Sequence, residues 1–178
     1  IAAPTQGAPN AALDDPRAAS LFARAVVEVI RQRSEAGAPF EMVHAHDWAG
    51  GMVPYLLRQC PESELSKLPA VLTIHDLANQ RLFQRSVLKS LGLSEDHFHP
   101  ERIEFYSHVS FLKAGVLAAN AVTTVSPTYA TEALTPESGE KYDGVLRTRK
   151  DRLIGIVNGI DYAVHNPMTD PAIIARYD

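Results

Sequence analysis

Cysteine is nearly absent from this chain of 178 residues, which contains Cys60 alone. A single thiol excludes an internal disulfide, a dithiol redox pair and a zinc site built from several cysteines. Because proteins without disulfides suit a reducing compartment, we expect this one in the cytoplasm.

Long apolar runs and an excess of basic charge are also lacking. No stretch approaches the roughly 20 consecutive apolar residues of a membrane span, and the amino terminus does not have the layout of a signal peptide. The 17 basic and 21 acidic residues give a net charge of −4. Neither nucleic acid nor an anionic membrane is therefore an expected partner.

Glycine-rich phosphate loops are missing as well. The sequence contains neither a Walker-type loop nor Gly-x-Gly-x-x-Gly, so an ordinary nucleoside triphosphatase and a dinucleotide site are both unsupported. Ser126 lacks the flanking glycines of a nucleophile elbow, which argues against a serine hydrolase of that kind.

What the chain does contain is a hydrophobic content of 46%, enough for one domain with a sizeable core. Four short apolar runs are each followed by polar residues. The runs span 40–45, 70–74, 121–125 and 153–157, and the polar groups are His46-Asp47-Trp48, His75-Asp76, Ser126-Pro127-Thr128 and Asn158-Gly159. Helical segments between the runs predict an α/β fold with a mostly parallel sheet and helices on both faces. Parallel strands end at one edge, where open α/β proteins bind ligands.

The first residues read as a lead-in to this domain. Residues 1–13 are rich in proline, glycine and alanine, so we expect them to be flexible. Asp14 or Asp15 followed by Pro16 predicts the start of a helix. Because the chain opens with Ile1 rather than methionine, we expect a fragment or processed piece of a longer protein.

Other helices are expected between the strands. Apolar spacing and proline positions predict them at 52–59, near 86–91, from about Pro100, from Pro127 and from Asp170-Pro171. Residues 135–152 are polar and are expected to be irregular.

The segment from His44 to Trp48 is the densest cluster of titratable groups. His44 and His46 share a face if the segment is a strand, and Asp47 then turns at its end. A metal site is disfavoured because Trp48 and Ala49 occupy the positions where a further ligand is needed. We interpret His44 as a core histidine and Trp48 as a packing residue. Asp47, beside two glycines, has few packing reasons to be there.

The other three polar groups each have a functional and an ordinary interpretation. His75 is either a surface loop residue or a hydrogen-bonding group aimed into the cleft. Ser126 and Thr128 stand at a strand-to-helix junction whose free N–H groups suit an anion, although a plain helix cap explains them equally well. Asn158 is either part of a turn or a ligand-binding residue.

At these residues the chain resembles the bacterial glycogen synthases and plant starch synthases. The matching stretches are HAHDW (44–48), LTIHDLA (72–78), HPERIEFYSHVSFLKAGVLAANAVTTVSPTYATE (99–132), YDGVLR (142–147) and GIVNGIDYAVHNPMTDP (155–171). The resemblance implies one of two Rossmann-like domains of a retaining glucosyltransferase. It also implies ADP-glucose as donor, or UDP-glucose as in some relatives, and an α-1,4-glucan as acceptor. It implies further that no metal or other cofactor is required, and that the location in a plant is the plastid.

Site residues follow from the same resemblance. Asp47 is expected near the reacting sugar and acceptor, and His75 is expected to contact the donor glucose. Asn158 would line the cleft, and Thr128 with Tyr129 would form its wall. Where the family often has asparagine, this chain has Asp76, whose charge would lie near an anionic leaving group.

Parts of the family's pattern are absent. The Lys-Thr-Gly-Gly-Leu loop on the first strand does not occur, nor does the carboxyl-terminal domain that supplies basic residues for the nucleotide sugar. We therefore expect residues 14–178 to be a partial amino-terminal domain, inactive by itself, whose partner is that carboxyl-terminal domain of the same enzyme. A glucan-binding module without chemistry and a related glycosyltransferase with another acceptor remain alternatives.

Overall fold

The computed structural model describes residues 15–60 and 64–177, so the expected lead-in over 1–13 lies outside the described residues. The helices are α1 (Pro16–Glu35), α2 (Asp47–Arg58), α3 (Val87–Leu91), α4 (Phe111–Ala118), α5 (Pro127–Glu132) and α6 (Asp143–Arg147), with 3-10 turns η1 (Glu64–Lys67), η2 (Glu95–His97) and η3 (Lys150–Arg152). The strands are β1 (Val43–His46), β2 (Ala70–Ile74), β3 (Leu82–Phe83), β4 (Glu104–Phe105), β5 (His108–Ser110), β6 (Ala121–Thr124) and β7 (Leu153–Gly155).

A parallel sheet organises the molecule. Its strand order is β1-β2-β6-β7, and every neighbouring pair is parallel. Ala45 pairs with Leu72, and Leu72 pairs with Val122, so these three side chains form one row on the same face. The predicted parallel α/β fold is confirmed, and all four predicted strands are present within a few residues of their expected bounds.

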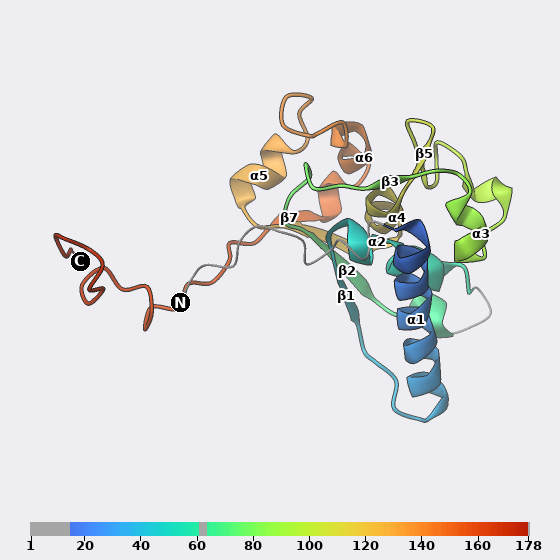
Figure 1. Cartoon of the computed structure of the whole chain (residues 1–178), viewed down its shortest axis with the longest axis horizontal. Helices are drawn as coiled ribbons and strands as arrows, with labels where there is room; N and C mark the ends of the chain where they lie inside the picture. The colour runs from blue at the N-terminus through green and yellow to red at the C-terminus, as the bar shows by residue number, and fades with distance from the viewer. Residues whose placement is uncertain (1–14, 61–63, 178) are drawn as a thin grey trace.

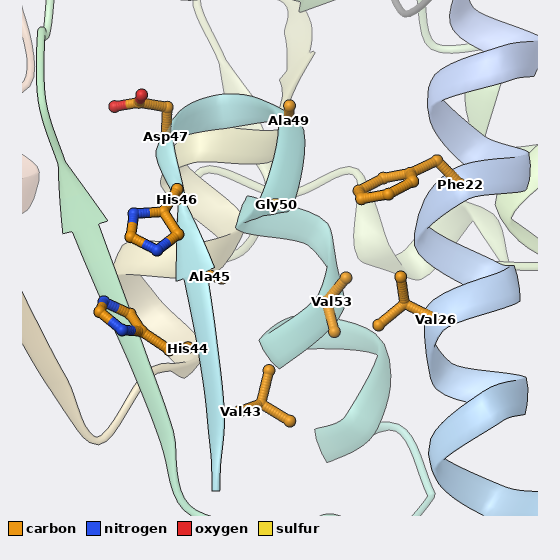
Figure 2. A pocket seen from close by; sticks show the side chains of 10 residues that line it. All are labelled: Phe22, Val26, Val43, His44, Ala45, His46, Asp47, Ala49, Gly50 and Val53. Carbon is orange, nitrogen blue, oxygen red and sulfur yellow. The ribbon is translucent and has the colours of Figure 1, made fainter.

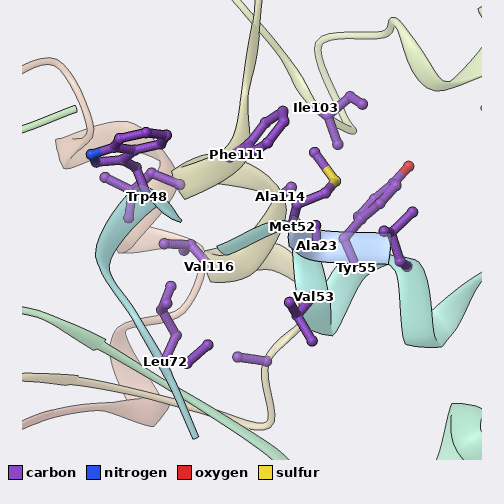
Figure 3. Packing of buried hydrophobic residues seen from close by; sticks show 14 of the residues in the cluster. Ala23, Trp48, Met52, Val53, Tyr55, Leu72, Ile103, Phe111, Ala114 and Val116 are labelled. Carbon is purple, nitrogen blue, oxygen red and sulfur yellow. The ribbon is translucent and has the colours of Figure 1, made fainter. Parts of the chain in front are cut away.

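Helices α2 and α4 cover that face of the sheet and cross each other closely. A Cβ added at Gly115 would lie 2.8 Å from the backbone of Gly51, so glycine is needed on both helices for this approach. Trp48, Phe111 and Leu72 are buried in the core between the helices and the sheet (Figure 3). Burying one such large side chain stabilises a fold by about 1.5–3 kcal/mol.

The opposite face of the sheet carries polar side chains. Figure 2 shows His44 and His46 on the side of β1 away from α2, while Val53 of α2 faces α1. His46 pairs in register with Thr73, and Thr73 with Thr123, so these residues continue the row across β2 and β6. In the described part of the chain the helices thus pack on one of the two faces. The expected second layer of helices is not present among these residues, because the other face carries histidine and threonine side chains and not a continuous apolar surface.

Helix α1 begins where the sequence predicts. The Asp15 carboxylate accepts a hydrogen bond from the Arg17 N–H (3.0 Å), with Pro16 following it in the first turn. The helix ends shortly before Gly37, whose φ of 72° suits glycine. Its buried side packs against α2 and α3 (Figure 1).

The helix predicted from about Pro100 is wrong in its first half. Residues 104–110 instead form the antiparallel pair β4 and β5, and α4 begins only at Phe111. Tyr106 and Ser107 adopt φ values of 48° and 63°, which turn the chain and end any helix. Ser110 then caps α4 by accepting the Lys113 N–H (3.0 Å). The apolar residues that recur here at helical spacing are therefore buried in a β-hairpin and not on one side of a helix.

Three other predicted elements need correction. The helix expected at 52–59 begins earlier, at Asp47, and residues 135–152 contain α6 and η3 instead of being wholly irregular. Asp170 starts no helix: its carboxylate accepts the Ala172 N–H (2.8 Å), as in a helix cap, but only a turn follows. Ile174 there is fully exposed, and a short helix without packing partners is not stable. The helices predicted near 86–91 and from Pro127 are confirmed as α3 and α5.

Beyond β7 the chain leaves the body of the protein. Residues 159–177 extend away from the sheet at the red end of Figure 1, and apolar side chains such as Tyr162 are exposed there. No helix within 15–60 or 64–177 has both the length and the apolar character that crossing a bilayer requires.

Candidate functional site

The carboxyl ends of the four parallel strands lie along one edge of the sheet, and a hollow on the open face of the sheet reaches this edge. This hollow has a volume of about 320 Å³. Its lining combines histidine, threonine and aliphatic side chains: Met42, His44, His46, Val71, Thr73, His75, Thr123, Thr124, Val125, Ile156 and Asn158. His75 and Asn158, two of the residues predicted from the sequence, thus share one cavity although 83 positions separate them in the chain.

Asp47 joins this group through a hydrogen bond. Its carboxylate accepts the backbone N–H of His75 (2.7 Å), which ties the end of β1 to the end of β2. Asp47 has a φ of 50°, a left-handed conformation that costs most residues roughly 1–2 kcal/mol and that aspartate tolerates better than most. Strain of this kind occurs at functional sites, where the surrounding fold maintains it.

The polar face of the sheet leads into the hollow as a hydrogen-bonded row. The Thr123 and Thr73 hydroxyls are 2.6 Å apart, and His44 Nε2 is 2.7 Å from the Thr73 hydroxyl. The His44 ring lies 4.3 Å from the His46 ring, centroid to centroid. His46 Nδ1 is in turn 3.0 Å from His75 Nε2. The row therefore ends on a predicted site residue.

Tyr129 lies next to this edge, on α5. Its hydroxyl accepts the N–H of Leu77 (3.2 Å), which fixes the loop after β2 against the helix. Burial raises the pKa of Tyr129, and the nearby Asp76 carboxylate acts in the same direction. Asp76 is exposed and accepts the Ala78 N–H (2.9 Å). Thr128 is exposed in the first turn of α5 and lies outside the lining of the hollow.

The described part of the chain places no fixed positive charge in the lining of the hollow. None of the described residues that line it is a lysine or an arginine. In the part of the chain that the structure describes, no group of three or more histidine, cysteine, aspartate or glutamate side chains is placed to hold a metal ion. The lining therefore offers hydrogen bonds and histidine rings to a ligand.

The prediction for Trp48 is confirmed and the prediction for His44 is wrong. Trp48 is 1% exposed and packs in the core, as predicted. His44 is exposed on the polar sheet face rather than buried, so its interpretation as a core histidine is wrong. The reason is that alternate residues of a strand point to opposite faces, and the helices cover the face of Ala45. The two glycines beside Asp47 serve packing, since Gly51 contacts α4 and Gly50 lies against Ala45 of β1.

Sequence reasoning missed His46 and the two threonines as members of the site. The signal was a spacing of two residues. Val71, Thr73 and His75 are every second residue along β2 and its end, so Thr73 and His75 share a face of the sheet with Val71. Which face the helices leave open depends on how the distant segments pack, and a local pattern does not contain that information.

Comparisons with known proteins agree on one family. The family model described as the starch synthase catalytic domain matches residues 5–148. The glycogen synthase of Thermodesulfovibrio yellowstonii is 43% identical over 169 residues, which cover 93% of this chain and 33% of that protein. The glycogen synthase of Bacillus subtilis is 44% identical over 168 residues, covering 93% of this chain and 34% of that protein.

A solved structure gives the same answer. The catalytic domain of starch synthase IV from Arabidopsis thaliana, bound to ADP and acarbose, matches with a TM-score of 0.76 at 34% identity. The match covers 93% of this chain and 34% of that one, so the chain spans about a third of the length of these relatives. With its parallel sheet and the polar edge that Asp47, His75 and Asn158 form, this chain belongs to the starch synthase catalytic domain family.

Proposed function

We propose that this chain is part of the amino-terminal, Rossmann-like domain of a retaining glucosyltransferase. The enzyme would transfer glucose from ADP-glucose to the non-reducing end of an α-1,4-glucan, as in glycogen or starch synthesis. Relatives named glycogen synthase, and a starch synthase domain bound to ADP and acarbose, support this donor and acceptor.

The observation that carries the proposal is the shared sheet edge. Asp47 bonds the His75 backbone, and His75 lines the same hollow as Asn158. In this proposal the Asp47 carboxylate lies beside the reacting sugar and the acceptor hydroxyl, where it favours positive charge developing on the sugar ring. His75 orients the donor glucose by hydrogen bonding, and Asn158 binds from the side of β7.

Neighbouring residues would shape the donor end of the cleft. Tyr129, fixed against the loop after β2 by the Leu77 N–H, and Thr128 form its wall. Asp76 adds an exposed carboxylate beside them. Because a nucleoside diphosphate is an anion, this charge weakens donor binding rather than strengthening it.

A departing diphosphate needs positive charge, and such stabilisation is usually the largest catalytic contribution. The described lining of the hollow provides no lysine or arginine. We therefore propose that 14–178 is a partial domain, that the basic groups come from other parts of a longer enzyme, including a carboxyl-terminal domain, and that the isolated chain does not turn over. The cytoplasm remains the predicted location.

The experiment uses both forms of the protein. With ADP-glucose and glycogen, the 178-residue chain should release no ADP above background, whereas a longer enzyme containing it should transfer glucose. In that enzyme, Asp47→Asn should lower kcat by about a hundredfold or more, since a charge present in the transition state is lost. Asp76→Asn should instead lower KM for ADP-glucose. Turnover by the isolated chain at the rate of the longer enzyme would contradict the proposal.

A glucan-binding module without chemistry is the second candidate. The same lack of cationic side chains in the described lining favours it, because sugars need no positive charge to bind. Cosedimentation of the chain with glycogen, together with failure of any longer form to use ADP-glucose, would select this function.

A further inference from the structure

We infer that His46 is a positioning residue that holds the His75 imidazole in one orientation toward the hollow and ties the tautomer of His75 to its own. The inference deepens the proposed function, on which it rests, by adding a residue that acts through His75 rather than on the substrate.

His75 needs such a partner because of its place in the chain. It follows the last residue of β2, so the sheet does not fix its ring, and its side chain is exposed. Asp47 fixes only its backbone, by accepting the N–H (2.7 Å). In the described part of the chain the ring has one hydrogen bond, between His75 Nε2 and His46 Nδ1 (3.0 Å). The two rings lie 5.2 Å apart and are inclined by 30°.

His46 is exposed, but the sheet and neighbouring side chains hold it in place. It is the last residue of β1 and pairs in register with Thr73 of β2. The His44 ring packs on it at 4.3 Å, and His44 Nε2 is fixed by the Thr73 hydroxyl (2.7 Å), which is fixed by Thr123 (2.6 Å). Three strands therefore support the nitrogen that faces His75, whereas a residue on a loop would move.

The charge state of His46 makes this contact selective. Desolvation lowers the pKa of His46, the neighbouring His44 and His75 lower it further, and the Asp47 carboxylate opposes them. His46 is consequently neutral at neutral pH and carries one ring proton. A hydrogen bond between Nδ1 of one neutral ring and Nε2 of another needs one of them to donate.

Only two of the four tautomer combinations satisfy that bond. Either His46 Nδ1–H donates, and His75 has its proton on Nδ1, or His75 Nε2–H donates, and His46 has its proton on Nε2. In both cases the two rings carry their proton on the same nitrogen. The tautomer of His75, and so the group it presents to a ligand, is therefore coupled to the tautomer of His46.

Nitrogen-15 spectra of the histidine rings test this in the 178-residue chain, at a pH well above that of imidazole titration. In the wild type, His46 and His75 should be in the same tautomer. His46→Phe keeps a ring but removes the nitrogen, and should change the His75 tautomer ratio about fivefold, the effect of one net hydrogen bond. His46→Asn places an amide near Nδ1 and should restore the ratio.

His165→Phe is the control, because it replaces an exposed imidazole outside this row of residues and leaves His44, Thr73 and His46 in place; it should leave the His75 spectrum unchanged. Opposite tautomers in the wild type, or an unchanged His75 spectrum in a folded His46→Phe chain, would overturn the inference. Circular dichroism reports folding, and the wild-type spectrum decides the matter if His46→Phe does not fold.

In the longer enzyme, His46→Phe should lower kcat by about tenfold with little change in KM, because a misplaced group costs rate rather than binding. His46→Asn should recover most of that loss. If the wild-type enzyme transfers no glucose, the proposed function fails, whereas the spectra still report on His46 and His75.

Discussion

The close approach of α2 and α4 gives a prediction about the stability of this fold. Gly51 of α2 is buried against α4, and an added Cβ would overlap the carbonyl oxygen of Phe111 and lie 2.9 Å from its carbonyl carbon. Both are backbone atoms, which cannot rotate away. We therefore expect Gly51→Ala to force α2 and α4 apart, across the core that contains Trp48.

The magnitude follows from two opposing effects. Overpacking a core costs about 1–3 kcal/mol, and an immovable backbone places Gly51 at the upper end of that range. Alanine gains up to about 1 kcal/mol over glycine in a helix. The net loss in the free energy of unfolding is then about 2 kcal/mol, which lowers the Tm of a chain of this size by about 4–8 °C.

Gly144→Ala is the control for this experiment. Gly144 is exposed in α6, and its nearest neighbour would lie 3.8 Å from the new Cβ, at ordinary contact distance. This variant should be as stable as the wild type or more stable, by up to about 1 kcal/mol. Urea unfolding followed by circular dichroism measures both. A Gly51→Ala chain that unfolds at the wild-type midpoint would show that the helices do not approach as described.

Three further predictions concern the site and its support. Asp47→Ala should lower the free energy of unfolding by about 2 kcal/mol, because it removes a charge-assisted hydrogen bond and leaves alanine at a φ of 50°. Asp47→Asn should cost less than about 1 kcal/mol, because asparagine tolerates this conformation. Equal losses for the two variants in urea unfolding would exclude this explanation. Since folding lowers the pKa of His46 from 6.5, the unfolded chain binds more protons than the folded one, and the free energy of unfolding should fall as pH drops below about 6.5. His46→Asn should make that fall shallower. A variant with the same pH profile as the wild type would argue against this role of His46. Tyr142→Phe should cost about 1 kcal/mol, because the buried hydroxyl lies 2.6 Å from that of Ser110, while the exposed Tyr162→Phe should cost nothing measurable in the same thermal melt.

Local signals in the sequence predicted the start of a helix correctly where neighbouring residues were sufficient to cause it. Asp15 with Pro16 starts α1, and Ser126 with Pro127 starts α5, because a cap and a first-turn proline need no distant partner. The helix predicted from about Pro100 is wrong in its first half because the apolar residues that a β-hairpin buries there happen to recur at helical spacing. Ser110 marks the point where the hairpin ends and α4 begins, because its hydroxyl caps α4 and bonds Tyr142.

The sequence by itself determined the class of fold and the polar edge. Apolar runs that alternate with helices favour parallel strands, and parallel strands must end on one side, so the order of residues alone assigns Asp47, His75 and Asn158 to a common edge. Tertiary structure alone decided which sheet face the helices leave open. That choice exposes His44, aligns it with Thr73 and Thr123, and brings His46 to His75, since contacts between strands far apart in the chain depend on register and packing.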